Sequence, residues 1–145
     1  MRNPAPRIIV AEDETLIRMD LVEMLRESGY DVVGEATNGE EAISLVEELA
    51  PDLVILDVKM PVLDGISAAE KIISLAPVLM LTAFSQRELV ERARDAGAMA
   101  YIVKPFTIND LMPAMEIAMS RHLQMKDRKS TRLNSSHTVI SYAVF

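Results

Sequence analysis

The chain has 145 residues, of which 50% are hydrophobic and 26% charged, and this composition is typical of one folded domain with a short appendage. It has no cysteine and only 2 histidines, which excludes disulfides, thiolate zinc sites and cysteine nucleophiles and disfavours a histidine-rich metal site. No apolar run approaches the ~20 residues that a membrane-spanning helix needs, and the first residues lack the apolar stretch of a signal peptide. We therefore expect a soluble, cytoplasmic protein without a membrane partner.

The net charge of −7 is distributed unevenly along the chain. Residues 1–120 carry 10 Lys/Arg against 21 Asp/Glu, a net charge of −11, whereas residues 121–145 carry 5 against 1, a net charge of +4. An acidic body repels phosphates, so we expect no direct contact of this chain with nucleic acid. Its carboxylates are suited instead to binding a hard cation.

Short continuous apolar runs alternate along the chain with segments whose apolar residues recur at helical spacing. This pattern predicts five strands, each followed by a helix. The strands are predicted at residues 7–11, 31–36, 52–57, 78–82 and 99–103. The helices are predicted at residues 14–28, 40–49, 64–75, 85–96 and from about 108 past 121.

Capping residues mark several of the predicted helix ends. Gly29 and Gly97 follow the first and fourth helices as C-terminal caps, Asp64 can cap the third, and Thr107 with Asp110 begins the last. In that last helix apolar positions step by 4, 3, 4 and 3, which predicts a short coiled-coil seam. The seam comprises Leu111, Met115, Ala118, His122 and Met125.

Strict alternation of strands and helices predicts a parallel sheet covered by helices on both faces. The third and fourth strands have no polar alternation, as expected for central parallel strands that are buried on both sides. Right-handed crossovers then give a doubly wound α/β fold. Sheets of this kind bind ligands beyond the carboxyl ends of their strands, where the strand order reverses.

Polar residues end four of the five predicted strands. Glu12 and Asp13 end the first, Asp57 the third and Thr82 the fourth, and Lys104 follows the fifth. Three close carboxylates repel one another, and a cation such as Mg²⁺, which prefers oxygen ligands, would remove that conflict. A carboxylate can also take a phosphoryl group as an acyl phosphate, with the cation, the ammonium and the hydroxyl as donors to it.

Four motifs follow one another at the ends of these strands. They are IIVAED at residues 8–13, LDVKMP at 56–61 with DG at 64–65, LTA at 81–83, and YIVKPF at 101–106. Together they resemble the receiver domain of bacterial two-component response regulators over residues 6–123. The resemblance implies a flavodoxin-like, five-stranded sheet of order 2-1-3-4-5 with five helices.

Three further segments sharpen the resemblance. RMDLVEMLR at residues 18–26, TAFSQR at 82–87 and DAGAMAY at 95–101 are similar to the receiver of actinobacterial antitermination regulators. In those proteins a coiled-coil stem leads to an RNA-binding ANTAR output domain, which we do not expect in this chain.

The resemblance implies roles for the acidic residues. Asp57 would be the phosphoacceptor, taking a phosphoryl group from a phosphohistidine of a sensor histidine kinase. Asp13 would hold Mg²⁺ together with Asp57, and Glu12 would act directly or through water. The backbone carbonyl of Lys59 would complete the protein ligands.

The resemblance also implies how the signal leaves the site. Lys104 would pair with the phosphate, Thr82 would move toward it, and Tyr101 would follow as the switch aromatic. The bond between Lys104 and Pro105 would be a cis peptide. The response would appear on the face formed by the fourth helix, the fifth strand and the fifth helix, which is also the expected face of a homodimer. Such a protein is no enzyme beyond slow autodephosphorylation.

Other interpretations stay open beside this one. Phosphatases of the haloacid dehalogenase type also use an Asp nucleophile and Mg²⁺, but they need a second Asp two residues on, where this chain has Lys59. A direct RNA-binding antiterminator is disfavoured by the acidic body. Leu16, near Asp20 and Glu23, is either a contact for the kinase or an ordinary packing residue.

The end of the chain differs from the rest. We expect residues 124–128 to be a truncated coiled-coil stem and residues 129–145 to be a non-native or disordered tail. The tail has no acid and resembles a vector- or adapter-derived run, so we expect that the natural reading frame was lost near Arg128. A native, disordered tail is the alternative.

Overall fold

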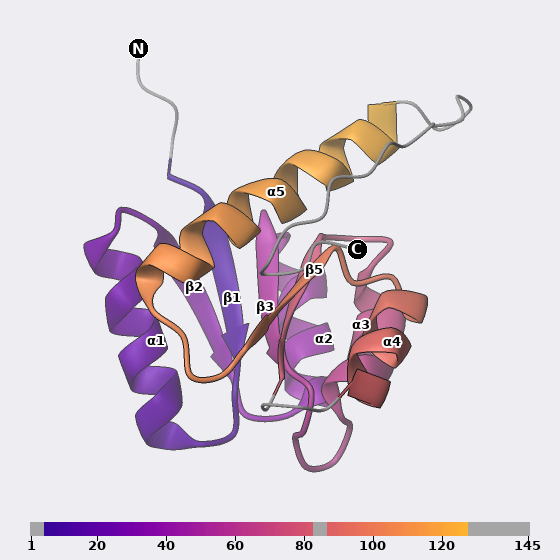
Figure 1. Cartoon of the computed structure of the whole chain (residues 1–145), viewed down its shortest axis with the longest axis horizontal. Coiled ribbons are helices and arrows are strands. Elements are labelled where there is room, and N and C mark those ends of the chain that lie inside the picture. Colours follow the sequence, from indigo (N-terminus) through magenta and orange to yellow (C-terminus); the bar gives the residue numbers. More distant parts are fainter. Residues whose placement is uncertain (1–4, 83–86, 128–145) are drawn as a thin grey trace.

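A computed structural model describes residues 5–82 and 87–127, which form a parallel sheet between two layers of helices (Figure 1). The strands lie in the order β2-β1-β3-β4-β5, and each neighbouring pair is parallel. This confirms the predicted doubly wound fold and its strand order. The strands are β1 (Arg7–Ala11), β2 (Asp31–Ala36), β3 (Leu53–Asp57), β4 (Val78–Thr82) and β5 (Ala100–Val103).

Five helices alternate with the strands, as predicted. They are α1 (Thr15–Glu27), α2 (Gly39–Leu49), α3 (Gly65–Ile72), α4 (Arg87–Asp95) and α5 (Ile108–Asp127). Helix α3 ends three residues earlier than predicted, because a tight turn in which the amide of Leu75 donates to the carbonyl of Ile72 leads the chain into β4. The predicted capping box at Ser85 lies outside the described residues.

The sheet separates two hydrophobic cores, and alternate residues of one strand serve each of them. Leu53 and Ile55 of β3 face the core under α1 and α5, whereas Val54 and Leu56 face the core under α2, α3 and α4. All five residues of β3 are buried, as are all five of β4. Packing on both faces therefore fixes the positions of these two central strands and of the residues at their carboxyl ends.

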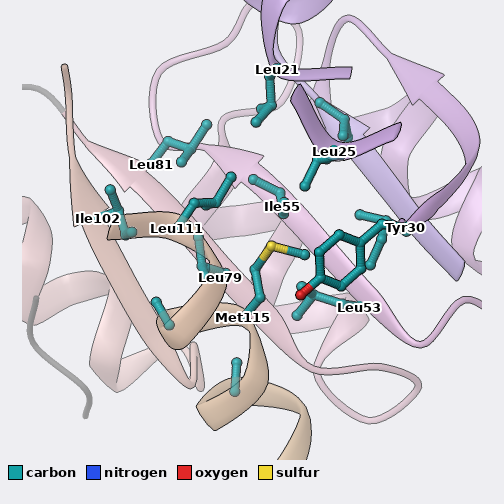
Figure 2. Close-up of a cluster of buried hydrophobic side chains, with 14 of the residues drawn as sticks. Leu21, Leu25, Tyr30, Leu53, Ile55, Leu79, Leu81, Ile102, Leu111 and Met115 are labelled. Atoms are coloured by element: carbon teal, nitrogen blue, oxygen red, sulfur yellow. The ribbon is translucent and has the colours of Figure 1, made fainter. Parts of the chain in front are cut away.

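The coiled-coil seam predicted for α5 is wrong for its first three positions. Leu111, Met115 and Ala118 are fully buried in the core shared with α1, where Met115 lies close to Tyr30 and Leu53 (Figure 2). Over two or three turns, the apolar spacing of a helix that packs on a sheet is nearly the same as that of a helix in a coiled coil. The sequence alone could therefore not distinguish the two. Of the other two positions, His122 is half-buried, and the side chain of Met125 lies outside the described residues.

The four predicted helix caps that lie within the described residues are confirmed. Gly29 and Gly97 adopt left-handed φ angles of 95° and 106° after α1 and α4. At the start of α3 the amide of Ser67 donates to Asp64 Oδ1 at 2.8 Å. At the start of α5 the amide of Thr107 donates to Asp110 Oδ2 at 3.0 Å. These local bonds need no tertiary partner, which is why residue identity alone predicted them.

Helix α5 continues through residues 124–127 of the predicted stem, while residue 128 and the predicted tail, 129–145, lie outside the described residues. None of the helices in the described part of the chain is both long and apolar enough to cross a bilayer. Leu16 on α1 is 80% exposed, which excludes the interpretation that it is an ordinary packing residue of this domain.

Candidate functional site

The carboxyl ends of β1 and β3 lie side by side, since these strands are neighbours and Ala11 pairs with Leu56. The residues that follow, Glu12 and Asp13, therefore meet Asp57 at one edge of the sheet. Carboxylate oxygens of the three acids all lie within 4.8 Å of one another. The structure thus brings together the three acids that the sequence analysis selected.

Lys104 reaches this acidic cluster from the loop after β5. Its Nζ lies 2.9 Å from Glu12 Oε1 and 3.2 Å from Asp57 Oδ2. The Glu12 side chain is completely buried, and a buried carboxylate is stable only with a partner of this kind. The peptide bond from Lys104 to Pro105 is cis, as the resemblance implied.

The pKa values of the site record an excess of negative charge. The pKa of Asp57 is raised to about 7, because burial and the neighbouring Glu12 carboxylate both raise it and Lys104 opposes them only in part. Burial by itself lowers the pKa of Lys104, but its hydrogen bond to Glu12 and the charges of both acids outweigh burial and leave that pKa raised. One ammonium therefore does not balance the cluster, and the site favours a further cation.

A hollow of about 510 Å³ adjoins the acidic cluster, and of the three acids only Asp13 lines it. Asp13 and Lys59 line it from the sheet edge, and Arg92 lines it from α4. Asp13 is exposed and makes no ion pair with another described residue. An exposed carboxylate beside two buried ones is an oxygen-only donor set that fits Mg²⁺, a cation that uses few protein ligands and keeps several waters.

Two residues of the site escaped the sequence analysis. Arg92 was not selected, because helical periodicity shows that a residue is exposed but not that it borders a hollow. Gly65 was noted only as part of a motif. A Cβ atom at Gly65 would collide with the backbone oxygen of Asp57, and the Gly65 amide donates to the carbonyl of Val58 at 2.9 Å. Glycine therefore allows α3 to begin directly against the end of β3.

The two predicted switch residues lie on neighbouring strands. Thr82 ends β4, is almost fully buried and pairs with Val103 of β5. Tyr101 of β5 pairs with Met80 and is half-buried against the core under α2, α3 and α4. Both residues therefore lie on the two strands that follow β3 in the sheet, and their motion stays a prediction.

Solved structures share this architecture. The signal receiver domain of a modulated diguanylate cyclase from Desulfovibrio desulfuricans G20 superposes with a TM-score of 0.77 at 28% identity, over 83% of this chain and 98% of that one. The response regulator domain of Thermotoga maritima CheB has a TM-score of 0.74 at 28% identity, over 80% of this chain and 97% of that one.

Relatives in sequence point the same way. The transcriptional regulatory protein PdtaR of Mycobacterium tuberculosis is 68% identical over 117 residues, which are 79% of this chain and 57% of that protein. The chain thus spans little more than half the length of this relative. The chemotaxis protein CheY of Thermotoga maritima is 38% identical over 112 residues, which are 75% of this chain and 93% of that protein.

Residues 8–116 match the response regulator receiver domain as a family. That range contains both the acidic cluster and Lys104, so the matched region and the site coincide. None of the relatives described above supports the phosphatase alternative. The fold, the site and these matches agree, and the chain belongs to the response regulator receiver domain family.

Proposed function

We propose that Asp57 accepts a phosphoryl group from a phosphohistidine of a sensor histidine kinase. The observation that carries this proposal is the position of Asp57 at the end of β3, with Lys104 Nζ at 3.2 Å and two further carboxylates within 4.8 Å. A nucleophilic carboxylate beside a fixed ammonium is the arrangement that phosphoryl transfer requires, since the transferred group is anionic.

Besides the two proteins, the transfer needs only a proton from solvent water for the departing imidazole. An Asp57 carboxylate oxygen forms a bond to phosphorus while the bond from phosphorus to the imidazole nitrogen breaks. The bonding electrons return to the imidazole, which takes up a proton. Lys104 holds Asp57 in place before the transfer and is then near enough to pair with a phosphoryl oxygen.

We propose that Glu12, Asp13, Asp57 and the backbone carbonyl of Lys59 hold Mg²⁺ during this step, with Glu12 acting directly or through water. Mg²⁺ would neutralise charge on the phosphoryl oxygens. The ion would also favour the ionised form of Asp57, whose pKa burial raises to about 7 in the metal-free protein. The protein contributes the fixed positions of the acids, since two of them are buried at strand ends.

The phosphorylated state would be read on the face formed by α4, β5 and α5. Thr82 would bond the new phosphoryl group and Tyr101 would follow, which gives the two states a differential contact. We propose that this face controls an output and can pair with a second copy of the chain. The name of the mycobacterial relative supports an output in transcription, and we expect antitermination.

Helix α1 offers the surface on which we propose that the kinase docks. Leu16 is 80% exposed and Met19 is 57% exposed, and both border a depression rimmed by Asp20 and Glu23. Exposed apolar side chains of this size with a polar rim are typical of a contact surface.

We also propose that the chain is cytoplasmic and that residues 6–123 form the receiver unit. We propose that no part of this chain contacts nucleic acid directly. We assign residues 124–128 to a truncated coiled-coil stem and residues 129–145 to a non-native or disordered tail.

Intact-mass measurement tests the proposal. With acetyl phosphate and Mg²⁺ the full chain should gain the mass of one phosphoryl group, in a bond that is labile to base. Asp57→Asn should abolish the gain, whereas Asp20→Asn, an exposed acid on α1, should keep it. An adduct that persists in Asp57→Asn would refute the assignment, and sustained release of phosphate from small phosphoesters would favour a phosphatase.

A further inference from the structure

Arg18 on α1 connects the acidic site to the edge of the sheet. Its side chain is only 15% exposed. Its Nη1 donates to the backbone carbonyl of Glu12 at 2.8 Å, and its Nε donates to Glu35 Oε1 of β2 at 3.2 Å. One planar guanidinium therefore holds the loop after β1 and the neighbouring strand in a fixed relation.

The carbonyl that Arg18 holds belongs to the peptide unit between Glu12 and Asp13. Because a peptide unit is planar, fixing its carbonyl also fixes its amide and the Cα position from which Asp13 begins. The other side of Glu12 is fixed as well, since its amide donates to the carbonyl of Ala36 at 3.0 Å. Arg18 thus supplies the second of two backbone anchors for the loop.

The two acids of this loop differ in how they are held. The carboxylate of Glu12 is bonded to Lys104 at 2.9 Å and to the amide of Glu14 at 3.2 Å. The carboxylate of Asp13 is exposed and has no ion pair among the described residues. The direction of Asp13 therefore depends on its backbone, which is the part that Arg18 restrains.

We propose that Arg18 is a positioning residue for a divalent cation at the acidic cluster. It fixes the peptide plane between Glu12 and Asp13, so that the exposed Asp13 carboxylate is held ready to bind. This inference rests on the proposed function, because it presumes that Glu12, Asp13 and Asp57 bind Mg²⁺. Arg18 itself touches neither the cation nor the phosphoryl group.

The direction in which Mg²⁺ affinity changes when Arg18 is removed separates positioning from a simple effect of charge. Arg18 is positive and lies next to the cation site, so its charge alone opposes Mg²⁺ binding. If charge were its only influence, removing Arg18 would tighten the binding of Mg²⁺. If Arg18 positions Asp13, removing it weakens the binding instead.

The experiment measures the Kd of Mg²⁺ for the full-length, metal-free chain by calorimetry, together with amide exchange. Arg18→Met keeps most of the apolar stem and loses both donors. We expect its Kd to rise by about 10-fold or more, the usual effect of losing a group that orients a metal ligand. The amides of Asp13 and Glu14 should exchange faster in the metal-free variant, while those of β3 should not.

A second arginine on α1 is a matched control. Arg26 Nη2 donates to the carbonyl of Val32 on β2 at 3.3 Å, so it also joins α1 to a strand, but away from the acids. Arg26→Met should leave the Kd within about twofold of the wild-type value. Arg18→Lys should fall between the wild type and Arg18→Met, because a single ammonium cannot reproduce the fork that reaches Glu12 and Glu35.

The possible results separate this inference from the proposed function. Wild-type or tighter Mg²⁺ binding by Arg18→Met, in a background where the wild type binds Mg²⁺, overturns the role of Arg18 alone. Failure of the wild type to bind Mg²⁺ and to accept phosphate overturns the proposed function and the inference with it. If Arg18→Met does not fold, Arg18→Lys decides, and wild-type Kd and wild-type exchange at Asp13 overturn the inference.

Discussion

The backbone amide of Lys104 donates to the backbone carbonyl of Thr82 at 2.8 Å. The ammonium and the hydroxyl of the site therefore sit on adjacent chain segments whose register is fixed by the main chain. A substitution of either side chain leaves this bond in place. The two side chains can thus be tested separately, without moving one by altering the other.

Thr82→Ala should still accept a phosphoryl group but should respond less on the face formed by α4, β5 and α5. The variant keeps the backbone bond to Lys104 and loses the hydroxyl that would contact the phosphoryl group. Amide exchange before and after treatment with acetyl phosphate measures the response. Thr82→Ser, which keeps a hydroxyl, should respond almost as the wild type does. An undiminished response in Thr82→Ala would argue against this coupling.

Asp57→Asn should stabilise the metal-free protein at pH 7.5. Burial raises the pKa of Asp57 to about 7 in the folded state, above the ~3.9 of an unfolded chain. Between these values the folded state holds a proton that the unfolded state has released, so the free energy of unfolding falls as pH rises through this window. Replacing the carboxyl by an amide removes this fall in the free energy of unfolding, which we place at roughly 1–3 kcal/mol.

Urea unfolding of both proteins in a chelator, at pH 7.5 and near pH 4, checks this prediction. The advantage of Asp57→Asn should nearly vanish at the lower pH, where Asp57 is protonated in the folded state and about half protonated in the unfolded state. Added Mg²⁺ should stabilise the wild type more than the variant, because it binds the folded state through the carboxylate. An advantage of equal size at both pH values would contradict the raised pKa.

Gly65→Ala should destabilise the domain by roughly 2–4 kcal/mol and should impair phosphorylation at Asp57. The added Cβ would collide with the backbone oxygen of Asp57, so either α3 or the end of β3 must shift. Gly29→Ala is the control, since nothing lies within 4 Å of its Cβ position. There only the left-handed φ of 95° is unfavourable, at about 1 kcal/mol. Urea unfolding gives the stabilities, and equal losses in the two variants would refute the steric argument.

Deletion of residues 129–145 should leave the melting temperature nearly unchanged and phosphorylation intact. The prediction comes from composition, since this stretch has no acid and follows the last of the five strand–helix units. A terminal segment with few apolar contacts can be removed at little cost. A fall of several degrees in the melting temperature would show that the segment packs on the domain.

Local pattern determined most of the fold. The apolar runs within residues 52–57 and at 78–82 were correctly predicted as central strands, because strands buried on both faces show no polar alternation. Once the strands were known, the position of the acids followed, since carboxyl ends of parallel strands share one edge. Glu12, Asp13 and Asp57 were therefore selected correctly as a cluster from sequence alone.

The tertiary structure decided what depends on contacts between distant segments. It assigned Leu111, Met115 and Ala118 to the core of the domain, because only packing on a sheet distinguishes that stripe from a coiled-coil seam. It raised the pKa of Asp57 to about 7, because burial and the proximity of Glu12 are properties of the folded chain. It brought Arg18 to the carbonyl of Glu12, a contact set by the docking of α1 rather than by any local pattern of residues.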